Sequence, residues 1–447
     1  MLDSILHLVI QLALPLLCLV ALCLMATRSS FFTIVLVWAG ILWSGYWQGL
    51  IEPIIWTSPL GVNVALMDII ATVLMGGAIL RLTSTRRVSG LQKLFLVYCA
   101  IVAISYLRGT IAFGLQSATN NLRTVYYFLS VTLYFSTCTL GRHELRNIMY
   151  TWFAGTGILV ALAMARWSAI IMPSFLDFIV IPPKCGLRVL YAIPAFLLAQ
   201  SLLILILNRR RRWSVGIPII ATAILAITVL LLQHRTVWVV LIVTGALVIW
   251  KKPALRSRVS LVAVFVLLLL IVMGLTIVGP QIFSALKLSA TRATSSHSTF
   301  TWRIAGWRAL FSHMSATDYL FGMPFGESYF IEEIHERGNI SPHSLYVSII
   351  ARVGLPGLLL FVGLYLRTLG KLAKYPFTTE TPYLSSSILW FLLVGQLVYG
   401  IAYSLSYSQG IFLGLAMAMA TCKPLAAKSR INTRIHGALY GEERNRA

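Results

Sequence analysis

The stretch VSLVAVFVLLLLIVMGLTIVG, residues 259–279, decides the fold, because it is apolar on every face and long enough to cross the hydrocarbon core of a bilayer. A strand of a membrane barrel would be shorter and would alternate apolar with polar residues, so this run predicts a transmembrane helix. Similar runs recur along the 447 residues, of which 58% are hydrophobic and 11% charged. The sequence therefore excludes a soluble globule and predicts an all-α, polytopic helical bundle in a membrane.

The apolar runs give the approximate positions of the spans. They are 5–26, 31–51, 60–82, 94–116, 122–140, 147–172, 188–207, 213–232, 236–250, 259–279, 344–366, 386–405 and 409–422. We expect 12 or 13 transmembrane helices, since one of the first two runs is either re-entrant or fused to its neighbour. No basic segment or cleavage pattern marks the first run as a removable signal, so we expect it to remain.

The formal charge of +23 comes from 36 basic and 13 acidic residues. The basic residues cluster between spans, and successive clusters are separated by two crossings, which is typical of cytoplasmic loops and not of a nucleic-acid binder. Five loops follow this rule: Arg81/Arg86/Arg87/Lys93, Arg142/Arg146, Arg209–Arg212, Lys251/Lys252/Arg256/Arg258 and Arg367/Lys371/Lys374. We therefore predict a membrane protein that contacts membrane lipids and no nucleic acid; the family resemblance described below implies that this membrane is the bacterial inner membrane.

This orientation divides the chain into four parts. Residues 1–279 are expected to form the N-terminal transmembrane helices, 280–343 a large outer loop with short helices, 344–422 the C-terminal transmembrane helices, and 423–447 a basic cytoplasmic tail; the resemblance described below implies that the outer side is the periplasm. The outer loop balances its basic residues with acidic ones, unlike the inner loops. Chemistry that needs water has few other places in so apolar a chain, so we expect the site in this loop.

Several cations lie on the predicted outer side, against the usual charge bias. Arg235 belongs at a hairpin tip, because only 38 residues, 213–250, are left for two crossings. Arg108, Arg123, Arg166, Lys184 and Arg188 fall near the outer ends of their helices. Each could bind a lipid headgroup or extend singly to the interface. As a set with Arg303, they favour an anionic ligand, because guanidinium groups bind phosphate oxygens bidentately.

His343 precedes a long span whose only charge is Arg352, which Asp68 could balance, and whose kink is expected at residues 354–357. The imidazole is therefore predicted at the outer mouth of the bundle. It could cap the helix, or it could act as a general base, since a neutral ring accepts a proton from a sugar hydroxyl. His297, His313 and His335 stand in more polar surroundings and are interpreted as surface residues.

Other chemistry finds little support in the sequence. The six cysteines lack metal or redox spacing, and no Gly-rich phosphate loop, Ser-His-Asp set or acidic metal pair is present. Glu332, Glu333 and Glu336 are expected on a solvated helix face. We therefore predict no metal and no cofactor. Residues 301–308 read as an amphipathic segment with Trp302 and Trp307 at the membrane interface, and residues 321–326 as a tight loop.

Four short motifs resemble the O-antigen ligase and polymerase superfamily of bacterial envelope glycosyltransferases. They are Gln233-His234-Arg235-Thr236 leading into a span, Arg303 with Trp307, the loop 321–326, and Pro342-His343-Ser344-Leu345-Tyr346 followed by Gly354-Leu355-Pro356-Gly357. The resemblance covers about residues 188–422. It implies transfer of a glycan from undecaprenyl diphosphate to an acceptor hydroxyl on the periplasmic face, without a metal.

The resemblance also implies roles for residues and a choice of acceptor. His343 would be catalytic, and Arg235 and Arg303, joined in our prediction by Arg188 and Arg123, would bind the donor diphosphate. A ligase passes the glycan to lipid A-core, which we slightly favour because of the single dominant outer loop, and a polymerase passes it to a second lipid-linked glycan. A transporter or flippase of a lipid-linked sugar and a non-catalytic scaffold are the alternatives from other classes.

Overall fold

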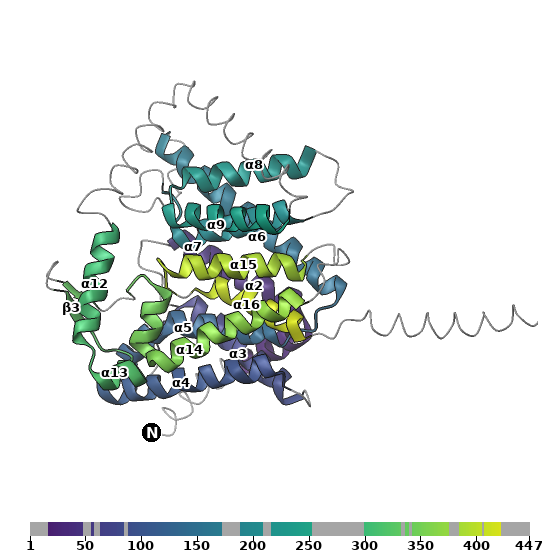
Figure 1. Ribbon diagram of the computed structural model, residues 1–447. Coiled ribbons are helices and arrows are strands. Elements are labelled where there is room, and N and C mark those ends of the chain that lie inside the picture. The colour runs from purple at the N-terminus through teal and green to yellow at the C-terminus, as the bar shows by residue number, and fades with distance from the viewer. Residues whose placement is uncertain are drawn as a thin grey trace, which may run out of the picture.

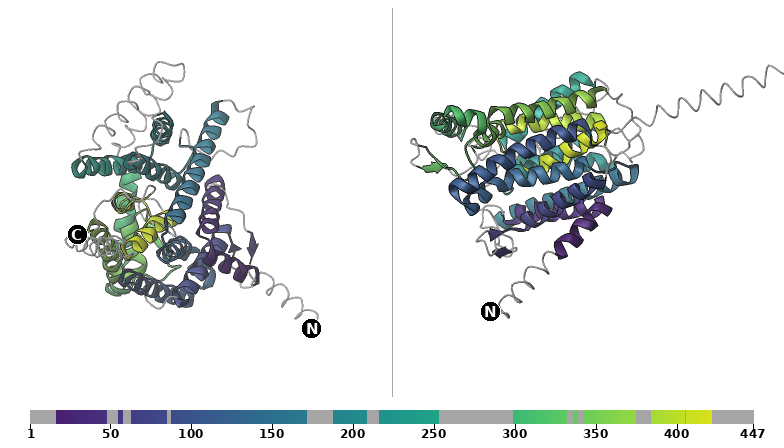
Figure 2. Two further views of the ribbon diagram at one scale, coloured as in Figure 1. Left: turned by 90° about the vertical axis from the view of Figure 1, so that its right-hand side faces the viewer. Right: turned by 90° about the horizontal axis from the view of Figure 1, so that it is seen from below.

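The computed structural model describes residues 17–47, 55–57, 63–84, 88–171, 188–208, 216–252, 299–331, 336–338, 342–374, 384–404 and 406–421. Helices make up nearly all of this part of the chain, as Figure 1 shows. The predicted all-α membrane bundle is therefore confirmed. Both views of Figure 2 show the helices packed side by side, with the N-terminal helices (purple) along one edge.

The elements follow one another along the chain with few strands among them. The helices are Leu17–Arg28, α2 (Ser30–Trp47), α3 (Leu66–Ser84), α4 (Gly90–Phe113), α5 (Leu115–Ser136), α6 (Arg142–Ile171), α7 (Ala192–Leu207), α8 (Gly216–Leu231), α9 (Arg235–Lys251), α12 (Thr299–His313), α13 (Ala316–Phe321), α14 (Leu345–Lys374), α15 (Ser386–Gly400) and α16 (Tyr407–Thr421). The strands are β1 (Trp56–Thr57), β2 (Asn63–Val64), β3 (Tyr329–Ile331) and β4 (Glu336–Gly338). The strands pair as two antiparallel hairpins, β1 with β2 and β3 with β4.

Four of the described helices, α3, α4, α6 and α14, are long and apolar enough to cross a membrane. Most predicted spans coincide with helices to within a few residues. Helix α5 begins at Leu115, earlier than the predicted 122, because polar residues such as Gln116 and Asn120 form its first turns without adding hydrophobicity. The predicted span 259–279 and the first part of 5–26 lie outside the described residues.

Two predictions about local structure need correction. The span predicted from residue 60 starts as a helix only at Leu66, because Asn63 and Val64 pair with β1. Glu336, expected on a helix face, lies in strand β4 opposite Ile331. Antiparallel pairing with β3 satisfies the backbone of β4 without a helix, and such pairing with another segment cannot be read from apolar periodicity alone.

Helix α5 forms the centre of the bundle, where it packs against α3, α4 and α16. Its contact with α16 is close because two glycines of α16 face it. A Cβ atom added at Gly410 would lie 2.8 Å from the Phe128 carbonyl oxygen, and one at Gly414 would lie 2.6 Å from that of Thr132. Small residues let helix backbones approach in this way inside membranes.

The helices alternate so that the bundle has two different ends. One end, which we call the basic end, holds Arg81, whose guanidinium donates to Tyr134 Oη at 3.0 Å, and Lys252, whose Nζ contacts Ser387 Oγ at 2.9 Å. The last turn of α14 also brings Lys371 and Lys374 to it. The described basic loops thus share one end of the bundle, as the alternation in the sequence predicts.

The opposite end, which we call the loop end, holds the turn at Gly114, the turn 232–234, the segment 342–344 that enters α14, and the turn after α15. In Figure 1, α12, α13 and β3 lie across this end, on the left of the bundle. The elements of the predicted outer loop that the structure describes therefore cover one end of the helices.

Helix α14 is kinked at Gly354, which has a φ of 75°, and Pro356 follows inside the helix. Proline has no N–H, so the Arg352 carbonyl loses its helical partner and accepts a hydrogen bond from Ser105 Oγ at 2.6 Å instead. The Ala351 carbonyl accepts from the Met323 N–H at 2.7 Å. The predicted kink is confirmed, and it docks α4 and the loop after α13 onto α14.

Candidate active site

His343 lies at the loop end, directly before the first turn of α14. Its φ of 50° places the backbone in the left-handed region, which a residue other than glycine adopts at a cost of about 1–3 kcal/mol. The next residue, Ser344, starts the helix, since its carbonyl oxygen accepts the Ser348 N–H at 2.9 Å. A conformation of this kind persists only where neighbouring groups hold it, and those groups come from α12.

Helix α12 contacts the histidine segment at two points. Trp307 Nε1 donates a hydrogen bond to the Pro342 carbonyl oxygen at 2.6 Å. One and a half turns earlier, the Trp302 ring lies against the His343 ring, with centroids 5.5 Å apart and planes at 52°. The amphipathic segment predicted from residue 301 is therefore a helix, and its two tryptophans fix the backbone and the ring of the histidine.

The protonation state of His343 follows from its surroundings. The side chain is half-buried, and this burial lowers the pKa of His343 below its usual 6.5, with a further lowering from the positive charge of Arg303. Both effects disfavour the imidazolium ion. At neutral pH the ring is therefore uncharged and has a lone pair with which it can accept a proton.

Arg303 is the residue after Trp302 on α12. Its guanidinium lies over the Tyr403 ring, 5.2 Å from the centroid. Tyr403 stacks on Tyr399 at 4.7 Å, and Tyr399 stacks on Phe196 of α7 at 4.0 Å. We call these three rings the aromatic stack. It connects α12 with α15 and α7, so the cation stands at the mouth of the helices and beside His343.

Arg235 is the first residue of α9, and the turn before it is as tight as the sequence predicts. Helix α8 ends at Leu231 and α9 begins at Arg235, with Gln233 at a φ of 55° between them. Helix α9 runs antiparallel to α15, because Lys252 at its far end contacts Ser387 near the start of α15. Arg235 therefore lies at the loop end, on the side of the bundle where α15 finishes.

Arg188 is held close to Arg235 by the segment that precedes α7. The buried Arg166 donates to the Val189 carbonyl oxygen at 2.8 Å, and His234 Nε2 contacts the Leu190 carbonyl oxygen at 2.8 Å. Burial, with a smaller contribution from the charge of Arg188, lowers the pKa of His234 to about 4. His234 is therefore neutral and donates from Nε2. The charge of Arg188 also acts on Arg235, so two like charges are gathered beside one turn.

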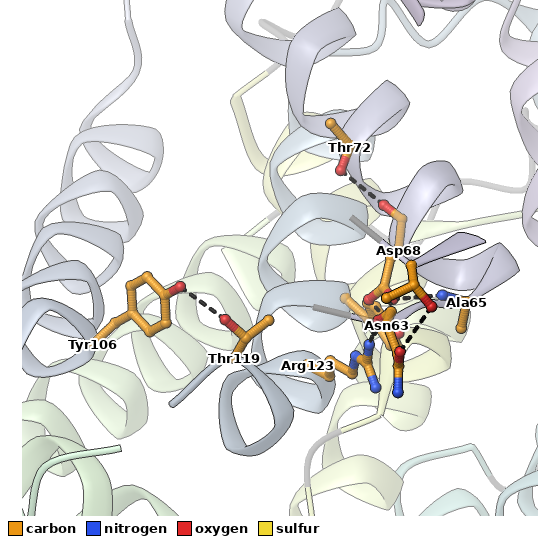
Figure 3. A network of polar contacts seen from close by, with 9 residues as sticks. Asn63, Ala65, Asp68, Thr72, Tyr106, Thr119 and Arg123 are labelled. Atoms are coloured by element: carbon orange, nitrogen blue, oxygen red, sulfur yellow. Dashed lines mark hydrogen bonds and ion pairs between the residues drawn. The ribbon is translucent and has the colours of Figure 1, made fainter. Parts of the chain in front are cut away.

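Arg123 belongs to a different part of the loop end. Its guanidinium forms an ion pair with Asp68 at 3.2 Å and donates to the Asn63 carbonyl oxygen. Asp68 also accepts from Tyr127 Oη at 2.7 Å and from the Ala65 N–H at 2.8 Å. Figure 3 shows Asn63, Ala65, Asp68 and Arg123 close together, and these residues come from the region of β2, α3 and α5. The structure thus gives Arg123 an intramolecular carboxylate and does not bring it to His343.

The expectation that Asp68 balances Arg352 is wrong, because Asp68 pairs with Arg123. Arg352 instead donates to the carbonyl oxygens of Pro324 at 2.8 Å and Glu327 at 3.0 Å. A guanidinium has five N–H groups, and backbone carbonyls of a tight loop can accept hydrogen bonds from them in place of a carboxylate. The deep charge that would favour a transporter therefore serves to dock the loop 321–326 onto α14.

The remaining predicted residues take peripheral positions. His313 is exposed at the end of α12 and lies 3.6 Å from Glu327, as expected of a surface histidine. His297 and His335 lie outside the described residues. The sequence reading missed the aromatic stack, although Tyr399 and Tyr403 are spaced by one helical turn and so share a face. Arg166, expected near the outer end of its helix, lies near the end of α6, and its side chain is fully buried.

Comparison with known proteins gives one family match. A family model described as O-antigen ligase matches residues 220–362, whereas the curated proteins gave no match. The matched range runs from α8 to the middle of α14 and contains Arg235, Arg303 and His343, with Arg188 and Arg123 outside it. Residues 220–362 of this chain are therefore similar to the O-antigen ligase family, which supports the resemblance to the O-antigen ligase and polymerase superfamily seen in the motifs.

Proposed function

We propose that the protein transfers a glycan from undecaprenyl diphosphate to a sugar hydroxyl of an acceptor, on the periplasmic face of the bacterial inner membrane. The observation that carries the proposal is the pairing of a neutral His343 with Arg303 at the loop end. A base and a cation side by side suit a reaction in which a hydroxyl loses its proton while a phosphate gains charge. Arg188 and Arg235 add two further cations at the same end.

The orientation rests on the charge difference between the two ends. Arg81, Lys252, Lys371 and Lys374 lie at the basic end, which the positive-inside tendency assigns to the cytoplasm. The loop end then faces the periplasm, and residues 280–343 form the catalytic loop between transmembrane residues 1–279 and 344–422. The tail 423–447 lies in the cytoplasm. A site on this face suits a donor that is anchored in the membrane by its prenyl chain.

The chemistry divides between the histidine and the arginines. His343 accepts the proton of the acceptor hydroxyl, and the hydroxyl oxygen attacks the anomeric carbon of the donor sugar. A new glycosidic C–O bond forms while the bond between this carbon and the phosphate oxygen breaks. Undecaprenyl diphosphate leaves with the bonding electron pair, and Arg303, Arg235 and Arg188 stabilise its charge. The three cations do the work that a metal ion does in many other transferases, so the reaction needs no metal.

The identity of the acceptor separates a ligase from a polymerase. We favour a ligase with lipid A-core as acceptor, because one dominant loop serves the site, whereas a polymerase would use a second lipid-linked glycan. Purified protein in vesicles with an undecaprenyl-diphosphate-linked glycan and either lipid A-core or excess donor alone decides between them. Growth of lipid A-core identifies a ligase, and growth of the lipid-linked chain a polymerase.

Two substitutions test the transfer itself. His343→Ala and Arg235→Ala should each abolish transfer to both acceptors, with the protein still inserted and folded. The matched controls are His313→Ala, an exposed histidine of the same loop, and Arg308→Ala, an exposed arginine of α12. Both controls should keep activity close to that of the wild type. Full activity in His343→Ala and Arg235→Ala would refute the proposal.

A further inference from the structure

The two tryptophans of α12 differ in how much of their side chains is exposed. Trp307 is half-buried and uses its N–H to hold the Pro342 carbonyl. Trp302 has 39% of its surface exposed, although its ring also touches the ring of His343. Trp302 therefore contacts the catalytic base and still presents aromatic surface to the outside. A side chain that only supported the histidine would be expected to bury this surface.

Trp302 also stands next to the charges of the site. Arg303 follows it on the helix and acts electrostatically on His343. Among the described residues, the imidazole therefore has both a cation and an indole as neighbours. If Arg303 takes the leaving diphosphate, the exposed indole beside His343 is the surface that is left to contact the acceptor.

An indole has the physical properties that a sugar ring requires. Its face carries partial negative charge and is apolar, so it attracts the weakly positive C–H groups on one face of a pyranose. It is rigid and presents a large surface with little loss of conformational entropy, as other aromatic recognition surfaces do. A tryptophan that only anchored the protein at a membrane interface would have the same exposure but no reason to touch the base.

We propose that Trp302 is the stacking platform of the acceptor site, on which a sugar of the acceptor lies so that its hydroxyl faces His343. The inference rests on the proposed transfer reaction and names the residue that binds its second substrate. It predicts that the indole contributes to acceptor binding and not to donor binding.

The experiment measures glycan transfer in vesicles while the acceptor, lipid A-core or the lipid-linked glycan, is titrated at fixed donor, and then the reverse. Trp302→Ala should raise the acceptor KM about tenfold and leave the donor KM unchanged, because an aromatic contact of this kind is worth about one decade in affinity. Trp302→Phe keeps an aromatic face and should restore most of the affinity. Trp302→Leu keeps an apolar side chain without the ring and should behave like alanine.

The control variant is Ile304→Ala, which removes an equally exposed apolar side chain from the same helix and should change neither KM. A lower kcat for Trp302→Leu with an unchanged acceptor KM would overturn the inference, because loss of simple support for His343 produces that pattern. If Trp302→Leu showed unchanged kinetics while His343→Ala was inactive, the inference about Trp302 would be overturned. The proposed function would then still stand. Activity in His343→Ala would instead refute the proposed function itself.

Discussion

Two arginines at the loop end of the bundle, Arg123 and Arg303, have opposite surroundings. Arg123 has a carboxylate within 3.2 Å and a backbone carbonyl beside it. Arg303 faces a tyrosine ring and a histidine, and within the described residues it forms no ion pair. Sequence position alone assigns both to one diphosphate site, but the structure separates them.

The difference follows from what each cation has available. An internal carboxylate satisfies the charge of Arg123 and leaves little reason for it to bind another anion. The ring face of Tyr403 attracts a cation weakly and leaves the N–H groups of Arg303 to a ligand. We therefore propose that Arg123, whose charge the fold neutralises, contributes to stability, and that Arg303, which lies against an aromatic ring, contributes to binding. The comparison yields predictions that differ for the two residues.

The largest expected effect concerns activity. Arg303→Gln should lower the rate of glycan transfer by about 10²–10³-fold, because it removes one charged donor from the leaving group. Arg123→Gln, measured in the same vesicles well below its melting temperature, should lower it by less than about tenfold. Comparable losses in the two variants would mean that the structural separation has no functional meaning.

The next largest effect is on the pH dependence of stability, and it arises from His234, which contacts the segment that carries Arg188. The unfolded chain binds a proton at His234 near pH 6.5, whereas folded His234 binds one only near pH 4. The folded protein should therefore lose stability as the pH falls from 6.5 to 4, by up to about 3 kcal/mol for this group. Thermal melting in detergent at a series of pH values measures the loss. His234→Gln should flatten the curve over this range, and an unchanged curve would contradict the assignment.

A smaller effect is expected on the free energy of unfolding when either partner of the Arg123–Asp68 ion pair is replaced. Asp68→Asn and Arg123→Gln should each lower the free energy of unfolding by about 1–2 kcal/mol, since the pair is partly exposed and solvent weakens it. The double variant should lose little more than either single one, because the two residues stabilise the protein through each other. Additive losses in thermal melting would show that Arg123 and Asp68 act separately.

The smallest effect is a shift in the pH profile. Burial and Arg303 lower the pKa of His343, so kcat/KM should stay constant as pH falls through 6.5 and decline only below it. Arg303→Gln removes one of the two causes and should move this decline to higher pH, although the rate itself is lower. Arg123→Gln should leave it in place. A profile that is identical in Arg303→Gln would show that the charge does not act on the titrating group.

Much of the fold could be predicted because it depends on local composition. Apolar runs give the helices, the short distance between basic loops gives the turn before Arg235, and Gly354 with Pro356 gives the kink in α14. The positions of Arg235, Arg303 and His343 could be predicted for the same reason, since each lies in or next to an element that the sequence defines, whereas their roles stay a proposal.

The remainder depends on packing between distant segments. Asp68 pairs with Arg123 on α5, and Arg352 donates to carbonyl groups of a loop. Neither set of partners follows from hydropathy or spacing. The aromatic stack likewise depends on the stacking of Phe196 on Tyr399, which lie about 200 residues apart in the sequence. Periodicity identifies the faces of a helix but does not identify what covers them.

Direct binding of undecaprenyl diphosphate, without glycan or acceptor, tests the central claim most directly. The dissociation constant of this lipid should be determined in detergent for the wild type, Arg303→Gln, Arg188→Gln and Arg123→Gln. We expect at least tenfold weaker binding for Arg303→Gln and Arg188→Gln, and wild-type binding for Arg123→Gln. Weakening by Arg123→Gln as large as that by Arg303→Gln would contradict the account.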